Sequence, residues 1–354
     1  MSSDEIRVRP ETLEIFLTEL FGKTGLEESD AIFLARTLVQ TNLWGIDSHG
    51  VIRVPIYAKR LQVGAINPRP QIRRIRGSKG LEIIDGDNGH GFIVGREAMK
   101  RAIELAREFN IGMVGIIKSN HFGAAGIYAR RAADQGMIGV AMTNVGPLMV
   151  ASGCSKPVVG NNPIAVAIPT LGPFPLVLDI AMSAVAQGKL LVASQKGEKI
   201  PLDWATDREG CPTDDPVKAF DGFSLPVGGH KGFGMALIID VLCGVITGGA
   251  FLSQVKGMYK YPDDPSLVGH CMIAINLSSI MGPEEMKTRM AAFCGMVKSA
   301  PMWDPSKEML LPGEIEHRMF LERMDKGIPI PISLCNELKD LGCEMGVSSV
   351  INPI

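Results

Sequence analysis

A serine, a histidine, an arginine and a tyrosine stand close together in the stretch GIDSHGVIRVPIY, as Ser48, His49, Arg53 and Tyr57. An arginine binds a carboxylate through two parallel hydrogen bonds, and a histidine gives or takes a proton near neutral pH. Adjacent residues cannot form a hydrolytic triad, because triad geometry comes from residues brought together in space. The group therefore suits recognition of a small 2-oxo or 2-hydroxy acid. Taken singly, Ser48 could be a helix N-cap, Arg53 a solvated charge and Tyr57 a core residue.

Another histidine, His121, stands in SNHFGAAG, between a predicted buried strand and a predicted helix. Ligands of open α/β sheets bind just outside the carboxyl ends of strands, so His121 is a candidate acid/base. The alternative is a histidine that caps the helix or satisfies a turn, and Ser119 or Asn120 is also available as the cap.

Two stretches could contact a polar or anionic cofactor. GGHKGFGMAL places His230 and Lys231 in a glycine-rich loop before a predicted helix, where free backbone N–H groups and a lysine can meet an anion; a flexible turn with a surface lysine is the alternative. LDIAMSAVAQGK carries Asp179 at a strand end, either as a helix cap or as a cofactor contact. The histidines show no HxxxH or HExxH spacing, so we predict no metal.

The motif GHGFIVG, residues 89–95, follows a predicted strand and opens a helix, as a dinucleotide-binding fingerprint does. Its turn, DGDNGHG, is longer and more polar than a Rossmann turn. The next strand ends in Lys118-Ser119-Asn120, where an acid for the ribose hydroxyls should stand, although Lys118 could meet a ribose phosphate. We favour glycines that serve the turn and helix packing.

The elements that must position these residues alternate between strands and helices. Apolar spacing predicts a helical region over 10–44 that is broken at Gly25, and another helix over 51–61. The series that follows predicts a layered sheet, and the chain beyond Glu284 is predicted to be mostly helical. The predicted strands are 81–85, 112–118, 137–144, 163–169, 175–181 and 266–280, and the predicted helices between them are 92–110, 123–136 and 232–245.

Composition limits the partners. The formal net charge of −2 over 354 residues gives no reason to invoke nucleic acid or an anionic membrane surface. Seven scattered cysteines without a CxxC pair fit reduced thiols in a cytoplasm, and the charged N-terminus lacks the order of a signal peptide. The most apolar window, 235–252, contains Asp240, which favours a buried helix over a membrane span. We expect a cytoplasmic protein with a small-molecule partner.

Taken together, six stretches resemble, in order and spacing, the malate/L-lactate dehydrogenase family, which also includes L-sulfolactate and ureidoglycolate dehydrogenases, 2,3-diketogulonate reductase and cyclic-imine reductases. The resemblance runs over nearly the whole chain. The stretches are residues 45–57, 119–139, 160–169, 178–189, 200–216 and 228–237.

The resemblance implies a three-layer α/β/α core with a mixed sheet, a fold unlike the Rossmann fold, flanked by helices from both chain ends. It also implies homodimers whose active sites lie near the subunit interface. We expect residues 1–75 to form a helical segment carrying substrate residues, 76–283 a mixed-sheet core with the nicotinamide cofactor site, and 284–354 a mostly helical segment that completes the fold.

The resemblance also implies roles for single residues. His121 matches the catalytic acid/base of the family, and Ser48 and His49 match a pair that delivers a proton in the imine reductases. Arg53 would hold the substrate carboxylate, with Tyr57 as a further substrate contact. The positions that match cofactor contacts are Val145, Asp179, Ile180, Ala181, Lys231, Gly313 and Glu314.

The implied reaction is hydride transfer between a nicotinamide cofactor and a small 2-hydroxy/2-oxo acid of the malate, lactate or sulfolactate type. The matched cofactor motifs contain no arginine cluster, which favours NAD over NADP. The alternatives are reduction of a cyclic imine 2-carboxylate and a nicotinamide-binding relative without turnover. Asn161 and Met182 depart from the family pattern near the expected pocket, and Lys118 could select a substrate with a second anionic group.

Overall fold

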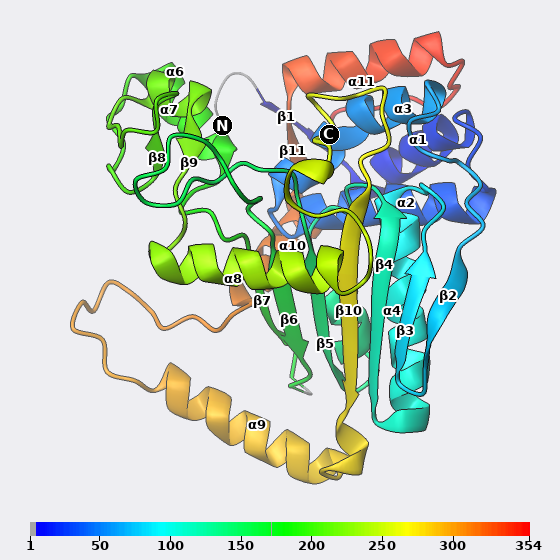
Figure 1. Cartoon of the computed structure of the whole chain (residues 1–354), viewed down its shortest axis with the longest axis vertical. Helices are drawn as coiled ribbons and strands as arrows, with labels where there is room; N and C mark the ends of the chain where they lie inside the picture. The colour runs from blue at the N-terminus through cyan, green and yellow to red at the C-terminus, as the bar shows by residue number, and fades with distance from the viewer. Residues whose placement is uncertain (1–4, 171) are drawn as a thin grey trace.

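The computed structural model describes residues 5–170 and 172–354, and its centre is a seven-stranded sheet (Figure 1). β3 and β4 run parallel, whereas every other pair of neighbours is antiparallel, so the sheet is mixed as predicted. In spatial order the strands are β2 (Arg73–Ser78), β3 (Leu81–Asp85), β4 (Ile111–Ser119), β10 (Val268–Asn276), β5 (Met137–Thr143), β6 (Ile164–Ile168) and β7 (Leu176–Ile180).

Helices cover both faces of this sheet. α4 (Gly91–Phe109) and α5 (Gly126–Ala133) pack on one face, and α8 (His230–Asp240) crosses the other face, in front of the strands in Figure 1. α4 turns an apolar stripe to the sheet, because its buried residues recur at helical spacing. The predicted three-layer α/β/α core is confirmed.

Segments from both chain ends pack together at one end of the sheet. β1 (Glu5–Val8) pairs with β11 (Ile328–Pro331), and Arg7 Nη1 donates to the carbonyl of Gly327, about 320 residues away, at 2.8 Å. One buried cluster extends from Val8 to Ile351. The helices of this region are α1 (Pro10–Gly22), α2 (Glu28–Leu43), α3 (Val54–Gln62), α10 (Glu314–Lys326) and α11 (Ile332–Glu344).

Two parts of the chain extend beyond the layers. A small lobe has its own buried cluster and contains α6 (Gln187–Lys196), β8 (Ala205–Thr206), α7 (Pro216–Asp221) and β9 (Phe223–Ser224). α9 (Pro283–Lys298) stands apart from the sheet at the lower edge of Figure 1, and it has no buried residue.

The predicted strands and helices have close counterparts, with a few differences. α8 begins at His230 and continues as one π-helical turn, Val241–Val245. The buried Asp240 accepts hydrogen bonds from Asn144 Nδ2 and the Leu252 N–H, both at 2.9 Å, which explains an acid inside the most apolar window. Among the described residues, none of the helices combines the length and apolarity needed to cross a bilayer.

Candidate active site

His121 lies just beyond the end of β4 and is hydrogen-bonded to Tyr57 of α3. The Tyr57 hydroxyl is 2.6 Å from His121 Nδ1, and the backbone N–H of Gly123 points to the same nitrogen at 3.4 Å. Because a backbone amide can only donate, Nδ1 serves as an acceptor, and the proton of the neutral imidazole belongs on Nε2. Tyr57 is only 1% exposed. The ring of His121 therefore offers the Nε2–H as a donor on the side away from Tyr57.

The second histidine of the site, His49, stacks against His121. Their ring centroids are 5.5 Å apart with planes 22° from parallel, and Ser48 Oγ is 2.9 Å from His49 Nδ1. Burial, helped by the charge of Arg53, lowers the pKa of His49 to about 4. Burial, followed by the nearby His49 and Arg53, lowers the pKa of His121 well below its usual range. Both imidazoles are therefore neutral at neutral pH.

Arg53 completes the predicted group at the start of α3. Its Nε donates to the carbonyl of Ser48 at 2.7 Å, and its Nη1 donates to the hydroxyl of Tyr259. The guanidinium carbon also lies 5.4 Å from the centroid of the Tyr259 ring. A guanidinium has five N–H groups. Two of them are used here, so three remain for a carboxylate.

Sequence reasoning missed two residues of the site, Tyr259 and Arg60. Arg60 is 1% exposed, and its Nη2 donates to Asn120 Oδ1 at 3.0 Å and to the carbonyl of Asp264 at 2.9 Å. It thereby ties the loop that carries Tyr259 to the residue before His121. Arg60 could have been noticed as an arginine on the predicted helix 51–61. Tyr259 stands 206 residues from its partner Arg53, so no local pattern in the sequence points to it.

Neither Ser119 nor Asn120, which were available as caps, caps the helix that follows. α5 begins at Gly126, five residues after His121, and its N-cap residue makes no side-chain cap. Ser119 Oγ instead lies 2.8 Å from Nε2 of the fully buried His270. The side chains of Ser119 and Asn120 therefore hold the end of β4 in place and do not cap the helix.

Lys118 forms an ion pair near the end of β4. Its Nζ lies 2.7 Å from the carboxylate of Asp85. The side chain of Lys118 is 54% exposed in this ion pair, and its use for a ribose phosphate or for a second anionic group of the substrate stays a prediction.

Comparison with known proteins agrees with this geometry. A family model described as malate/L-lactate dehydrogenase matches residues 8–339. The chain belongs to the malate/L-lactate dehydrogenase family. It is 39% identical to L-sulfolactate dehydrogenase of Methanocaldococcus jannaschii, over 96% of this chain and 98% of that protein. It is 38% identical to malate dehydrogenase of Pyrococcus abyssi, over 98% of this chain and 96% of that protein.

A solved structure agrees as well. Sulfolactate dehydrogenase from Methanocaldococcus jannaschii superimposes with a TM-score of 0.91 at 38% identity, covering 97% of this chain and 98% of that one. The predicted family and fold are confirmed. The predicted class of enzyme, a dehydrogenase of 2-hydroxy acids, follows from membership in the malate/L-lactate dehydrogenase family.

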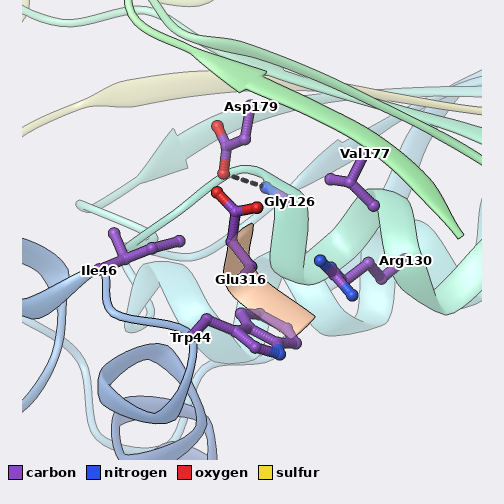
Figure 2. A pocket seen from close by; sticks show the side chains of 7 residues that line it. All are labelled: Trp44, Ile46, Gly126, Arg130, Val177, Asp179 and Glu316. Carbon is purple, nitrogen blue, oxygen red and sulfur yellow. Dashed lines mark hydrogen bonds between the residues drawn. The ribbon is translucent and has the colours of Figure 1, made fainter. Parts of the chain in front are cut away.

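Asp179 is one of the positions that match cofactor contacts in the malate/L-lactate dehydrogenase family. Figure 2 shows its carboxylate at the first turn of α5, where Oδ2 accepts the Gly126 N–H at 2.7 Å. Burial raises its pKa to about 6, although the Gly126 bond opposes the shift, and the nearby Glu316 raises it further. Asp179 of β7 thus accepts the backbone N–H of the first residue of α5. This bond joins β7 to the segment that follows His121.

Backbone contacts connect other family cofactor positions. The Val145 N–H donates to Asn162 Oδ1 at 2.8 Å, and the Met182 N–H donates to the Asn161 carbonyl at 2.8 Å. The Val227 N–H then donates to the Met182 carbonyl at 2.9 Å, which leads to the loop before Lys231. Ile180 and Ala181 lie on this path, between Asp179 and Met182. The Met182 side chain is fully buried against α8.

Gly313 and Glu314 lie beside β7. The Val177 N–H donates to the carbonyl of Pro312 at 3.1 Å, which holds Gly313 against the strand that carries Asp179. The Glu314 carboxylate accepts the Leu311 N–H at 3.0 Å and lies 2.8 Å from Lys298 Nζ; these contacts lower its pKa to about 2. The Glu314 side chain is therefore occupied within the chain, and its backbone N–H also donates to the Leu311 carbonyl at 3.0 Å.

The donor set fits a nicotinamide coenzyme. The exposed Lys231 stands in the first turn of α8, after Gly228 and Gly229, which have positive φ angles of 59° and 61° and open space where a side chain would stand. A cation in a glycine-rich turn suits a pyrophosphate, and a half-buried carboxylate such as Asp179 suits hydroxyl or amide donors. In residues 5–170 and 172–354, no three metal-ligating side chains come together.

Replacing Tyr57 by phenylalanine tests the bond to His121. The variant removes the hydroxyl that donates to Nδ1 and keeps the buried ring, so we expect kcat to fall about 10-fold to 100-fold, a part of the 10²–10⁴ that positioned proton transfer supplies. Steady-state kinetics checks this result. An unchanged kcat would show that the phenol is only a core residue.

Proposed function

We propose that this protein transfers a hydride reversibly between a nicotinamide coenzyme and C2 of a small 2-hydroxy/2-oxo acid of the malate, lactate or sulfolactate type. The relatives named L-sulfolactate and malate dehydrogenase support this substrate class. One group of neighbouring side chains carries the proposal. In this group Tyr57 holds the neutral His121, and Arg53 keeps N–H groups that none of the described residues uses.

The coenzyme supplies or takes up the hydride at C4 of its nicotinamide ring. Arg53 binds the carboxylate of the acid through two parallel hydrogen bonds, which fixes the orientation of C2. As His121 donates the proton on Nε2 to the substrate oxygen, Nδ1 takes up the proton of the Tyr57 hydroxyl, so the imidazole stays neutral, and Tyr57 regains a proton from solvent before the next turnover. In the oxidation direction both transfers reverse, so that Nδ1 returns a proton to the Tyr57 oxygen as Nε2 takes the proton of the alcohol.

We assign the proton transfer to His121 rather than His49. The Tyr57 and Gly123 donors fix the tautomer of His121, whereas His49 has a serine hydroxyl, which can donate or accept. His49 stacks on one face of the His121 ring, and the Ser48 carbonyl accepts a hydrogen bond from the Arg53 guanidinium.

The better coenzyme in this proposal is NAD. The segments that carry Asp179 and Lys231 contain no arginine cluster for a ribose phosphate, although Arg130 lines one small pocket together with the acids Asp179 and Glu316 (Figure 2). This preference predicts a higher kcat/KM with NADH than with NADPH.

Loss of the absorbance of the reduced nicotinamide tests the function. The purified protein is mixed with NADH or NADPH and with oxaloacetate, pyruvate, 3-sulfopyruvate, diketogulonate or piperideine-2-carboxylate. We expect turnover with at least one of the acyclic 2-oxo acids. Turnover of the cyclic imine alone would replace the proposal by the imine reductase alternative, and coenzyme binding without any turnover would favour a non-catalytic relative.

We further propose that the working form is a homodimer that covers α9. Every residue of α9 is at least partly exposed, and Met296 is 75% exposed, Phe293 53% and the following Trp303 91%. Large apolar side chains gathered in one exposed segment mark an interaction surface. A second copy of the chain is the partner that the family resemblance implies.

Introducing charges into this surface tests the dimer. We expect the chain to elute with a mass about twice its 38.1 kDa in light-scattering chromatography. Met296→Glu combined with Phe293→Glu shifts the mass to that of one chain. Lys100→Glu, on an exposed position of α4, is the matched control and leaves the mass unchanged. A monomeric wild-type protein would contradict the proposal.

A further inference from the structure

The motif GHGFIVG, which the fold does not use as a phosphate-binding loop, lies behind the catalytic histidine. The carbonyl of Gly89 accepts a hydrogen bond from Asn120 Nδ2 at 2.9 Å. A side chain on Gly91 would overlap the carbonyl oxygens of Asn120 and His121, so only glycine permits this approach. The two glycines therefore bring the residue between them, His90, next to the segment that ends in His121.

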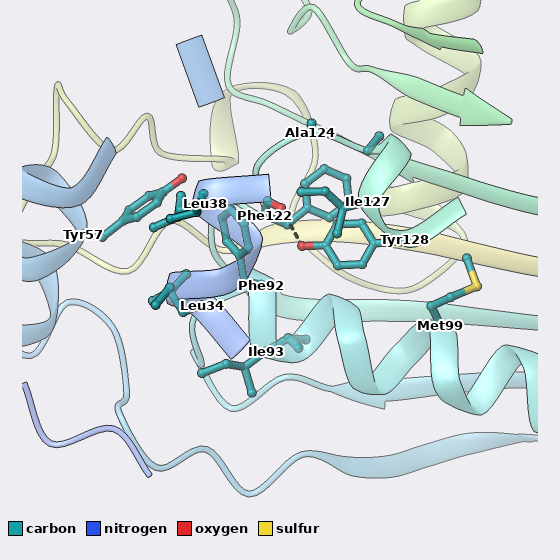
Figure 3. Packing of buried hydrophobic residues seen from close by; sticks show 14 of the residues in the cluster. Leu34, Leu38, Tyr57, Phe92, Ile93, Met99, Phe122, Ala124, Ile127 and Tyr128 are labelled. Atoms are coloured by element: carbon teal, nitrogen blue, oxygen red, sulfur yellow. Dashed lines mark hydrogen bonds between the residues drawn. The ribbon is translucent and has the colours of Figure 1, made fainter. Parts of the chain in front are cut away.

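His90 is fully buried and contacts the aromatic ring that holds His121. Its ring meets the Tyr57 ring edge to face, with centroids 4.7 Å apart and planes at 83°. Phe92 lies against both rings, at centroid distances of 5.5 Å from His90 and 5.9 Å from Tyr57. Figure 3 shows Tyr57 and Phe92 within the same packed group as Phe122 and Tyr128. His90 thus forms part of the wall that fixes Tyr57.

The hydrogen bonds of His90 define its tautomer. Nδ1 accepts the Phe92 N–H at 3.4 Å as the cap of α4, so the ring proton belongs on Nε2. Among the described residues, Nε2 is the one buried side-chain nitrogen or oxygen without a hydrogen-bond partner. An N–H donor without a partner is unfavourable in a core, and the face of an adjacent aromatic ring is a weak acceptor for it.

We propose that His90 is a positioning residue of the dehydrogenase reaction. Its ring holds the Tyr57 phenol in the orientation that donates to His121 Nδ1, and so keeps the His121 proton on Nε2, toward the substrate. The proposal deepens the proposed function, because it rests on His121 as the proton donor. His90 contacts neither the acid nor the coenzyme in this role.

Two substitutions separate the ring of His90 from its cap. His90→Asn keeps an acceptor for the Phe92 N–H and removes the ring, whereas His90→Phe keeps a ring and removes both polar atoms. We expect kcat to fall about 10-fold in His90→Asn and about 3-fold in His90→Phe, with the KM values of acid and coenzyme within twofold of wild type. Equal losses in both variants, or kcat within twofold of wild type in His90→Asn, would overturn the proposal.

A double variant tests whether His90 acts through Tyr57. In a Tyr57→Phe background the hydroxyl is already missing, so adding His90→Asn changes kcat by less than twofold. Independent structural damage would instead multiply the two losses, and that result would overturn the proposal. Thermal unfolding of each variant confirms that the compared proteins are folded.

A second measurement does not depend on activity. In protein labelled with ¹⁵N-histidine, the ring nitrogens of His121, assigned by the loss of its signals in His121→Gln, report one tautomer with the proton on Nε2. We expect His90→Asn to move these signals toward an average of the two tautomers, and an unchanged spectrum would overturn the proposal. A changed spectrum in a protein that turns over no substrate of the panel would instead contradict the proposed function alone.

Discussion

Replacing His121 by glutamine lowers kcat by about 10²–10⁴-fold, while the Kd of the coenzyme stays within about twofold. The glutamine amide reaches the position of Nε2 and can donate a hydrogen bond, but it cannot transfer a proton. The loss therefore isolates proton transfer from substrate binding. Stopped-flow and steady-state kinetics give kcat, and coenzyme fluorescence gives Kd.

His49→Gln is the matched control for this result. His49 stacks on His121 at 5.5 Å but lacks the Tyr57 contact, so we expect a loss of about 10-fold or less. A larger loss in His49→Gln than in His121→Gln would exchange the roles of the two histidines. Nearly unchanged kcat in both variants would contradict acid/base catalysis by either histidine.

The protonation state of His121 also predicts a pH dependence. Its pKa lies well below the usual range, because the ring is buried and faces His49 and Arg53. The neutral form, with its proton on Nε2, is thus already the main form from about pH 6 to 8, and kcat for reduction should be nearly flat there. If an imidazolium with an ordinary pKa were the donor, kcat would fall as the pH rises through about 6.5. Initial rates across this range distinguish the two.

The residues that could be found from the sequence are those whose partners are local. Ser48, His49 and Arg53 lie on two short 3-10 turns, Asp47–His49 and Val51–Arg53, so one stretch of chain carries them together. His121 was found because a strand and a helix flank it, and both leave a clear apolar pattern. The alternation of the same patterns predicted the layered core.

What remained hidden depends on contacts between distant parts of the chain. The pairing of β1 with β11 joins four-residue strands from opposite ends, which are too short to show a pattern. Tyr259 meets Arg53 only because the buried Arg60 holds its loop in place. The bond of Tyr57 to His121 spans 64 residues, so the sequence could predict a substrate contact but not the support of a proton donor.

Arg53→Ala is expected to lower kcat/KM for the acid by about 10²–10⁴-fold, mainly through KM. Hydrogen bonds to charged groups contribute about 1.5–3 kcal/mol each, so two of them give about 3–6 kcal/mol. The guanidinium is already oriented by the Ser48 carbonyl and the Tyr259 hydroxyl, so binding the acid requires little further ordering. Arg53→Lys keeps the charge without the fork, and we expect it to recover no more than about 10-fold.

Whether the KM of the acid changes alone, or together with the KM of the coenzyme, distinguishes a carboxylate contact from a general loss of structure. The KM of the coenzyme should stay within about twofold, because the side-chain hydrogen bonds of Arg53 go to Ser48 and Tyr259 and not to the Asp179 or Lys231 segments. Arg36→Ala, which removes an exposed arginine paired with Glu14 at 3.7 Å, should leave both constants unchanged. If Arg53→Ala raised the KM of the coenzyme instead of that of the acid, the guanidinium would bind the coenzyme, and the acid would need another anchor.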